Sequence, residues 1–168
     1  PIGGADPLDS EGVRFNCILE FADGAGEVKL SANDPNVQPA LNYRYLELDR
    51  DVERLRESVR ITVKLLEDEA FGPIVAERLQ PTDDDLSTDE NLDRWMRKTV
   101  FNTTHASGTC KIGPASDPTA VVDQRLNIHG LENIKVADAS VMPNVIRANT
   151  NATTIMIGER AADWLRNP

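Results

Sequence analysis

The sequence is poor in cysteine. Only Cys17 and Cys110 occur among 168 residues, and they lie far apart in the chain. No CxxC pair and no Cys/His cluster has the spacing of metal ligands, so we expect neither a disulfide framework nor a bound metal. Two separated thiols are typical of a protein in a reducing compartment. We therefore expect both thiols to be free and the protein to be cytoplasmic.

Long apolar runs and excess positive charge are also missing. No run approaches the ~20 apolar residues that span a bilayer, and the N-terminus has no signal-peptide pattern, so we expect no transmembrane segment. Lys and Arg total 18 against 28 Asp and Glu, which gives a net charge of -10. Binding to nucleic acid requires an excess of cations, so nucleic acid is not an expected partner. No pattern indicates an oligomeric state.

The remaining composition is typical of a folded domain, and its first part favours strands. Hydrophobic residues make up 40% of the chain and charged residues 27%. Residues 13–21, 27–31 and 41–45 have strand-like patterns, and the glycine-rich residues 22–26 favour a turn between the first two. We predict an antiparallel sheet from these segments. Residues 1–12, rich in Gly, Pro and Asp, are expected to form a loop.

Two amphipathic helices are predicted next. In the first, which begins at Asp49, apolar residues recur at steps of three and four as far as Leu66. The second follows Ser87–Glu90, where the Ser-x-x-Glu spacing predicts a capping box. Its apolar stripe comprises Leu92, Trp95, Met96 and Val100. The acidic run Asp83–Asp85 lacks the glycine and terminal glutamate of a calcium loop, so we interpret it as a solvated approach to this helix.

The last third of the chain predicts short strands and a final helix. Residues 121–122 and 134–136 have strand patterns, and the second strand ends at Asp138, in a position where α/β proteins collect ligands. A helix is predicted over residues 152–165, beginning close to Asn151. Thr150 or Asn151 is suited to cap it, and the N–H groups at a helix N-terminus attract electron-rich ligands.

His105 is a candidate base because it lies in a polar loop that contains glycine. Histidine has an unperturbed pKa of ~6.5, which lets the side chain accept a proton near neutral pH. Taken alone, the residue is more simply interpreted as a surface or capping histidine that Thr104, Thr109 or the backbone could satisfy. A capping role is likewise the simpler interpretation of Asn151, and His129 is interpreted as structural.

Five segments in the last third, taken in order and with their gaps, resemble the C-terminal signature of the glucose-methanol-choline (GMC) oxidoreductase family. These segments are His105–Gly113, Val121–Asp123, Leu126–Leu131, Val136–Pro143 and Asn149–Thr153. The ending Asn-x-Asn-Ala-x-Thr-Ile-Met-Ile-Gly-Glu most resembles the choline dehydrogenase and choline oxidase branch. Ala106 departs from the pattern, because many members have proline there.

The resemblance implies an α+β fold: an antiparallel sheet with helices on one face, plus a C-terminal strand and helix that complete a flavin domain. Residues 1–130 would form the substrate-binding domain, and residues 131–168 would return to the FAD-binding domain. The Gly-x-Gly-x-x-Gly motif that anchors FAD is absent, since Gly24-Ala25-Gly26 does not continue the pattern. We therefore expect the chain to be the C-terminal portion of a longer enzyme, inactive when isolated, whose partner is an N-terminal FAD-binding domain.

The resemblance also implies catalytic roles. His105 would take the hydroxyl proton of a small-molecule alcohol while hydride passes from its carbon to flavin N5. Asn151 would hydrogen-bond the alkoxide. The sequence does not indicate which alcohol is oxidised.

Further residues are implied to contact the flavin. Asp138 and Ala139 would meet its ribityl-pyrophosphate region, while Asn151, Ala152 and Thr153 would approach the isoalloxazine edge. Two other functions remain open on the residues alone. The chain could be a non-catalytic interaction domain that retains the family fold, or part of a flavin-containing hydroxynitrile lyase.

Overall fold

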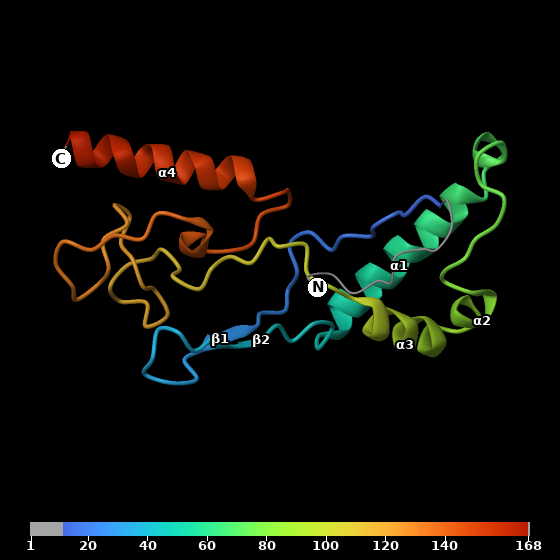
Figure 1. The fold of residues 1–168 in the computed structure, drawn as a ribbon, viewed down its shortest axis with the longest axis horizontal. Coiled ribbons are helices and arrows are strands. Elements are labelled where there is room, and N and C mark those ends of the chain that lie inside the picture. Colours follow the sequence, from blue (N-terminus) through green and yellow to red (C-terminus); the bar gives the residue numbers. More distant parts are fainter. Residues whose placement is uncertain (1–11, 168) are drawn as a thin grey trace. The chain divides into compact units, whose positions relative to one another are not determined.

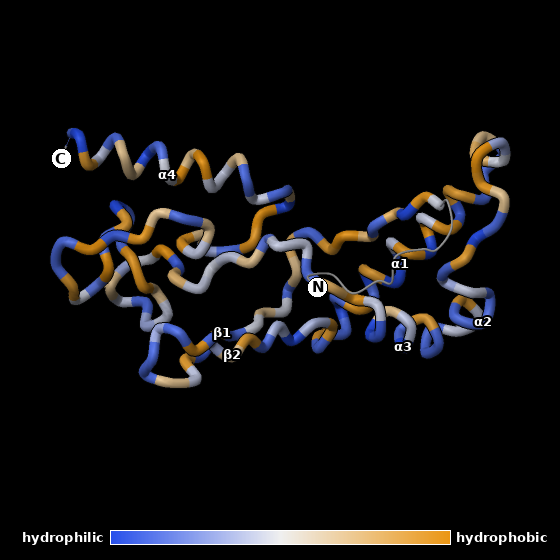
Figure 2. The backbone as a smooth tube through the Cα atoms, in the orientation of Figure 1, coloured by the Kyte–Doolittle hydropathy of each residue, from blue (hydrophilic) through white to orange (hydrophobic). Residues whose placement is uncertain are grey.

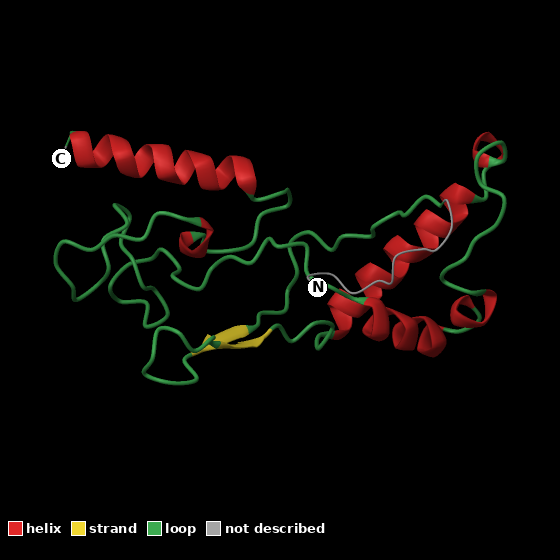
Figure 3. Ribbon diagram, in the orientation of Figure 1, coloured by secondary structure: helices red, strands yellow, loops and turns green. Residues whose placement is uncertain are grey.

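The structure, a computed structural model, describes residues 12–167 (Figure 1). The loop expected at residues 1–12 lies outside this range except for its last residue. The helices are α1 (Asp49–Leu66), α2 (Asp83–Leu86), α3 (Asp89–Thr99) and α4 (Asn151–Arg166), with short 3-10 helices η1 (Glu69–Phe71) and η2 (Ala139–Val141). Strands β1 (Glu27–Lys29) and β2 (Ala40–Asn42) pair in a two-stranded antiparallel sheet. The fold class is α+β, as predicted (Figure 3).

The chain divides into two compact units. The first comprises the described residues up to 26 together with residues 41–101, and the second comprises residues 27–40 and those from 102 onward. The predicted functional boundary between residues 130 and 131 is a separate assignment and stays a prediction. Both Cys17 and Cys110 are free thiols, as expected. Within residues 12–167, no helix is both long and apolar enough to cross a membrane.

Helices α1 and α3 form the core of the first unit. Figure 2 shows apolar residues recurring along both helices, as their sequence periodicity predicts. The buried apolar side chains of this core are Leu46, Val52, Leu55, Val59, Leu92 and Met96. Beside this core, Arg56 of α1 donates two hydrogen bonds of 2.8 Å to Asp93 of α3 and one of 2.9 Å to Asp89. Paired hydrogen bonds of this kind hold α1 and α3 together and also fix the position of one helix along the other.

The helix caps differ from the prediction. Thr88, not Ser87, caps α3, because its hydroxyl accepts from the backbone N–H of Asn91 at 3.1 Å. A capping box is present one helix earlier, where Thr82 and Asp85 exchange hydrogen bonds at the start of α2. The predicted solvated approach at 83–85 is therefore itself a one-turn helix. Ser87 is the C-terminal cap of α2, and Thr88 therefore takes the N-cap position of α3.

The structure contains less strand than the sequence predicts in the first part of the chain. Residues 13–21 do not form a strand, and the chain bends at residues 20 and 21, where Phe21 has a φ of 57°. The predicted strand at 41–45 ends at Asn42, because Arg44 and Leu46 adopt positive φ angles of 50° and 57°. Such angles interrupt the extended backbone that a strand requires. Tyr43 and Tyr45 still share a side, with their rings stacked 5.0 Å apart.

The second unit is built mainly from loops around a small core. Val122, Leu126, Val141 and Ala161 are buried, and Ile157 and Trp164 of α4 pack against them. The strands predicted at 121–122 and 134–136 are present only as isolated bridges: Val122 bridges to both Ile112 and Ile128, and Lys135 bridges to Asn127. The turn between those bridges is held by Asp123, whose carboxylate accepts from Asn127 and from the backbone N–H of Arg125. Side-chain hydrogen bonds thus hold this turn in place of the longer backbone ladder of a regular sheet.

Candidate active site

The loop after His105 lies against η2. The backbone N–H groups of Gly108, Cys110 and Ile112 donate to the carbonyls of Ala139, Ser140 and Val141 at 3.3, 2.9 and 2.9 Å, respectively. Gly108 has a φ of 81°, which favours glycine, and a Cβ there would lie 3.4 Å from the Met142 carbonyl oxygen. These contacts position the His105 loop beside the segment that follows Asp138.

Helix η2 joins this loop to α4. At its start, the exposed Asp138 accepts a 2.8 Å hydrogen bond from the backbone N–H of Ser140. Val141, at its end, is 3% exposed and shares the core with Ala161 of α4. The structure therefore brings three predicted site segments into one continuous arrangement: the His105 loop, the Asp138–Ala139 turn and the last helix.

The His105 side chain is half-buried and has one nitrogen engaged. Its Nδ1 lies 3.1 Å from the hydroxyl of Thr103, a contact in which either atom can donate. No hydrogen bond within residues 12–167 engages Nε2. Between these residues, Thr104 has a φ of 62°, and its backbone N–H donates to the Asn102 side chain at 2.7 Å. A non-glycine residue in this region is uncommon, and such strain clusters at functional sites.

The expected partner of this histidine was Thr104, Thr109 or the backbone, but the structure gives that place to Thr103. The Thr-x-His spacing was the available signal. His129, the other histidine, has a structural contact: its Nε2 donates to the Gly113 carbonyl oxygen at 3.0 Å. A carbonyl oxygen can only accept, so this nitrogen carries a proton and cannot act as a base.

The N-terminus of α4 is free of side-chain caps. Thr150 occupies the N-cap position and is buried, but its side chain makes no capping hydrogen bond, contrary to the prediction for Thr150 or Asn151. The first turn contains no acidic residue. Asn151 and Ala152 are exposed, and Thr153 is half-buried. An uncapped start to a helix of 16 residues fits the electron-rich edge of a flavin ring.

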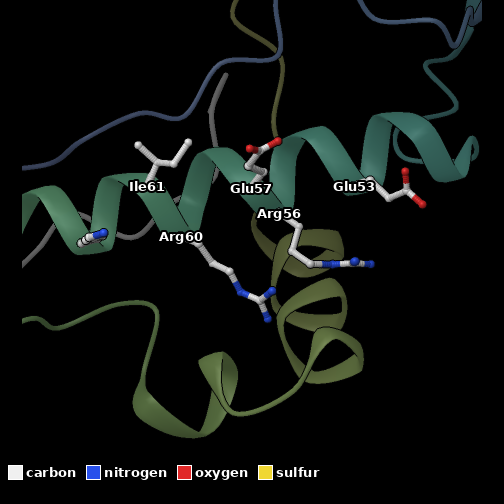
Figure 4. Close-up of a pocket in the computed structure, with 6 residues that line it drawn as sticks. Glu53, Arg56, Glu57, Arg60 and Ile61 are labelled. Carbon is white, nitrogen blue, oxygen red and sulfur yellow. The ribbon is translucent and has the colours of Figure 1, made fainter.

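A metal site and a ligand cavity are the other kinds of site that such side chains can form. Across the described residues, no three His, Cys, Asp or Glu side chains are grouped so that they could hold a metal ion. A cavity of about 290 Å³ lies along α1 in the first unit, lined by Glu53, Arg56, Glu57, Arg60, Ile61 and Lys64 (Figure 4). Its two arginines are paired with carboxylates of α3, Arg56 with Asp89 and Asp93 and Arg60 with Asp89. These pairs serve helix packing, so the cavity offers no free cation pair to a ligand.

Comparisons with known proteins support the interpretation of the signature. The family model described as GMC oxidoreductase matches residues 22–158. The mitochondrial choline dehydrogenase of Mus musculus is 37% identical over 163 residues, which are 97% of this chain and 27% of that protein. The oxygen-dependent choline dehydrogenase of Proteus mirabilis is 38% identical over 97% of this chain and 29% of its own length. This chain therefore spans less than a third of these relatives.

Solved structures show the same likeness. A pyridoxine 4-oxidase from Mesorbium loti superposes with a TM-score of 0.78 at 27% identity, over 85% of this chain and 27% of that one. A formate oxidase from Aspergillus oryzae superposes with a TM-score of 0.75 at 30% identity, over 84% of this chain and 24% of its own length.

Proposed function

Since this chain belongs to the GMC oxidoreductase family, as its C-terminal domain, we propose that it supplies the substrate side of an FAD-dependent alcohol oxidoreductase. In this proposal, residues 1–130 bind the substrate and residues 131–168 complete the FAD-binding domain, whose main part is the N-terminal partner. The observation that carries the proposal is the arrangement around η2. Backbone hydrogen bonds tie η2 to the His105 loop, and a shared core ties it to α4, whose first turn is uncapped.

FAD is the cofactor that family membership assigns to the full-length enzyme, and it would supply the hydride acceptor. The exposed N-terminus of α4 fits the ring edge, with Asn151, Ala152 and Thr153 nearest to it. Asp138 is exposed, and its carboxylate is suited to accept from ribityl hydroxyls, while Ala139 follows it in the same turn. These contacts orient the cofactor, whereas its anchor belongs to the N-terminal domain.

In this proposal, His105 is the base that accepts the hydroxyl proton of the alcohol. When Nδ1 donates its hydrogen to the Thr103 hydroxyl, Nε2 holds a free lone pair and can accept the substrate hydroxyl proton. The amide of Asn151 can donate a hydrogen bond to the alkoxide that develops. A positioned base contributes ~10²–10⁴-fold to a rate. Choline is the first alcohol to test, because relatives at 37% and 38% identity are choline dehydrogenases.

Substitution of His105 in the full-length enzyme tests the proposal. His105→Ala should lower kcat and kcat/KM together by ~10²–10⁴-fold, because the lost interaction belongs to the transition state. The FAD content should be unchanged, since the anchor lies elsewhere. His129→Gln is the matched control, because glutamine can still donate to the Gly113 carbonyl, and it should leave turnover close to that of the parent enzyme.

The outcome separates the proposal from its alternatives. A His105→Ala enzyme with full flavin content and near-normal flavin reduction would reject His105 as the base. If none of the alcohols tested reduces the flavin of the parent enzyme, the chain is better described as a non-catalytic domain. Asn151→Ala should also slow reduction, because it removes the hydrogen bond proposed for the developing alkoxide.

A further inference from the structure

The backbone takes an unfavourable conformation directly before His105. Thr104 has a φ of 62°, in the left-handed region that glycine and asparagine adopt more readily. For a β-branched residue such as threonine, this angle is an outlier. Thr104 is exposed, so core packing does not force the angle on it. The conformation therefore persists only because neighbouring hydrogen bonds stabilise it.

The side chain of Asn102 supplies one of these hydrogen bonds. Its Oδ1 accepts from the backbone N–H of Thr104 at 2.7 Å. An asparagine side chain that accepts from the backbone two residues further on closes a small turn. The Thr104 hydroxyl adds a 2.6 Å hydrogen bond to the backbone carbonyl of Thr103. Because Asn102→Ala would leave the Thr104 N–H without its acceptor, the turn depends on Asn102.

This turn brings the side chains of Thr103 and His105 together. In an extended chain, residues two positions apart are separated by ~7 Å along the backbone. Here the Thr103 hydroxyl lies 3.1 Å from Nδ1 of His105. A hydrogen bond between two short side chains at this spacing requires the chain to turn between them, and Thr104 is the residue that turns it. Asn102 thus acts on the His105 ring through two successive hydrogen bonds.

We propose that Asn102 is a positioning residue for His105, because it holds Thr104 in the conformation that keeps the Thr103 hydroxyl beside Nδ1. This inference rests on the proposed function, in which His105 is the base. When the Thr103 hydroxyl accepts from Nδ1, the ring hydrogen stays on Nδ1, and the lone pair of Nε2 can accept the proton of the alcohol. Asn102 itself contacts neither the substrate nor the flavin in this mechanism.

A double-mutant cycle in the full-length enzyme isolates the turn. Asn102 has a further interaction as well, so Asn102→Ala alone does not separate the turn from that contact. Thr104→Gly provides the second background, because glycine adopts the left-handed conformation without a stabilising hydrogen bond. Asn102→Ala should lower the limiting rate of anaerobic flavin reduction by about 2- to 13-fold in the parent, the full effect of one neutral hydrogen bond, but by less than about 2-fold in the Thr104→Gly background. An equal factor in both backgrounds would overturn the proposal, because Asn102 would then act through its other interaction.

The tautomer of His105 gives a second readout, which does not depend on turnover. Nitrogen-15 NMR of the full-length enzyme with labelled histidine, at a pH where imidazole is neutral, shows which ring nitrogen carries hydrogen, and the signals of His105 are those that His105→Ala removes. The parent enzyme should have the hydrogen on Nδ1. Asn102→Ala should give a mixture of tautomers, and adding Thr104→Gly should restore the Nδ1 form. A hydrogen on Nε2 in the parent enzyme would overturn the proposal.

Two more variants complete the test. Asp34 accepts from the backbone N–H of Asn36 at 2.9 Å, in a turn of the same kind between β1 and β2, so Asp34→Ala is the matched control and should change neither readout. Asn102→Ser keeps an oxygen that can accept from the Thr104 N–H, so it should reduce flavin faster than Asn102→Ala, and it replaces that variant in the cycle if Asn102→Ala does not fold.

The two readouts separate this inference from the proposed function. Mixed tautomers in Asn102→Ala with an unchanged rate of flavin reduction would uphold the positioning role and reject His105 as the base. Slow reduction by His105→Ala, together with an unchanged tautomer and rate in Asn102→Ala, would retain the base and reject the positioning role.

Discussion

Replacing Thr103 with valine in the full-length enzyme should slow flavin reduction while leaving the fold intact. The two side chains have almost the same shape, so the change removes the hydroxyl and little else. That hydroxyl is the one partner of the His105 ring among the described residues, at 3.1 Å from Nδ1. The proposed base needs its lone pair on Nε2, which requires the hydrogen to stay on Nδ1. Without the hydroxyl, the ring is free to rotate and to adopt the other tautomer.

The magnitude follows from the strength of this contact. A hydrogen bond between neutral groups contributes about 0.5–1.5 kcal/mol. If all of it serves to orient the base in the transition state, the rate should fall about 2- to 13-fold, at 1.36 kcal/mol for each factor of ten. The effect should be much smaller than that of His105→Ala, because in the proposed mechanism Thr103 only orients the base.

Stopped-flow measurement of flavin reduction under anaerobic conditions gives the required rates. Thr103→Val should lower the limiting rate, with little change in substrate affinity, FAD content or Tm, and Thr103→Ser should restore the rate because it keeps the hydroxyl. A purely structural role would lower Tm and leave the limiting rate alone. Reduction by Thr103→Val at the parent rate, or a Thr103→Ser variant as slow as valine, would refute the reasoning.

Two further predictions concern stability. Asp51, which is 4% exposed, accepts from the backbone N–H groups of Asp23 and Gly24 at 2.9 and 2.8 Å. Asp51→Ala should therefore lower the free energy of unfolding in urea by about 2–4 kcal/mol, whereas alanine at the exposed Glu53 should change it little; equal effects would contradict this account. Burial raises the pKa of Asp123, but hydrogen bonds from the Asn127 side chain and from two backbone N–H groups outweigh it and lower that pKa. Stability from this carboxylate should be present above the unfolded pKa of about 3.9 and lost as the pH falls through the lower folded value. The stability difference between the parent and Asp123→Ala should thus shrink in urea titrations between neutral pH and about pH 3, and a constant difference would refute it.

The helices could be predicted from the sequence because their signals are local. Apolar steps of three and four residues define α1 and α3, and α4 was placed to within one residue at each end. The strands could not be placed as well, because a ladder depends on a partner that the local pattern does not contain. The alternation at 13–21 is real in its side-chain contacts, yet no ladder forms there. Positive φ angles at Arg44 and Leu46, which no sequence signal marked, ended the third strand early.

The candidate site shows the same division. Spacing and resemblance singled out His105 and Asn151, and the structure gives their segments a common support in η2. The partner of His105 was missed, because it depends on the left-handed backbone at Thr104. That angle turns the chain between Thr103 and His105, so that two residues separated by one position can share a hydrogen bond. Threonine has no sequence signal for this conformation, unlike glycine or asparagine.

The supports of the site belong to the second unit alone. The ladder between the His105 loop and η2, the contact of η2 with α4 and the small core around Val122 all lie within residues 102–167. The relative placement of His105 and the start of α4 is therefore set by local contacts of this chain, before any partner binds. In the proposed enzyme, a partner domain would thus find the candidate site segments already arranged.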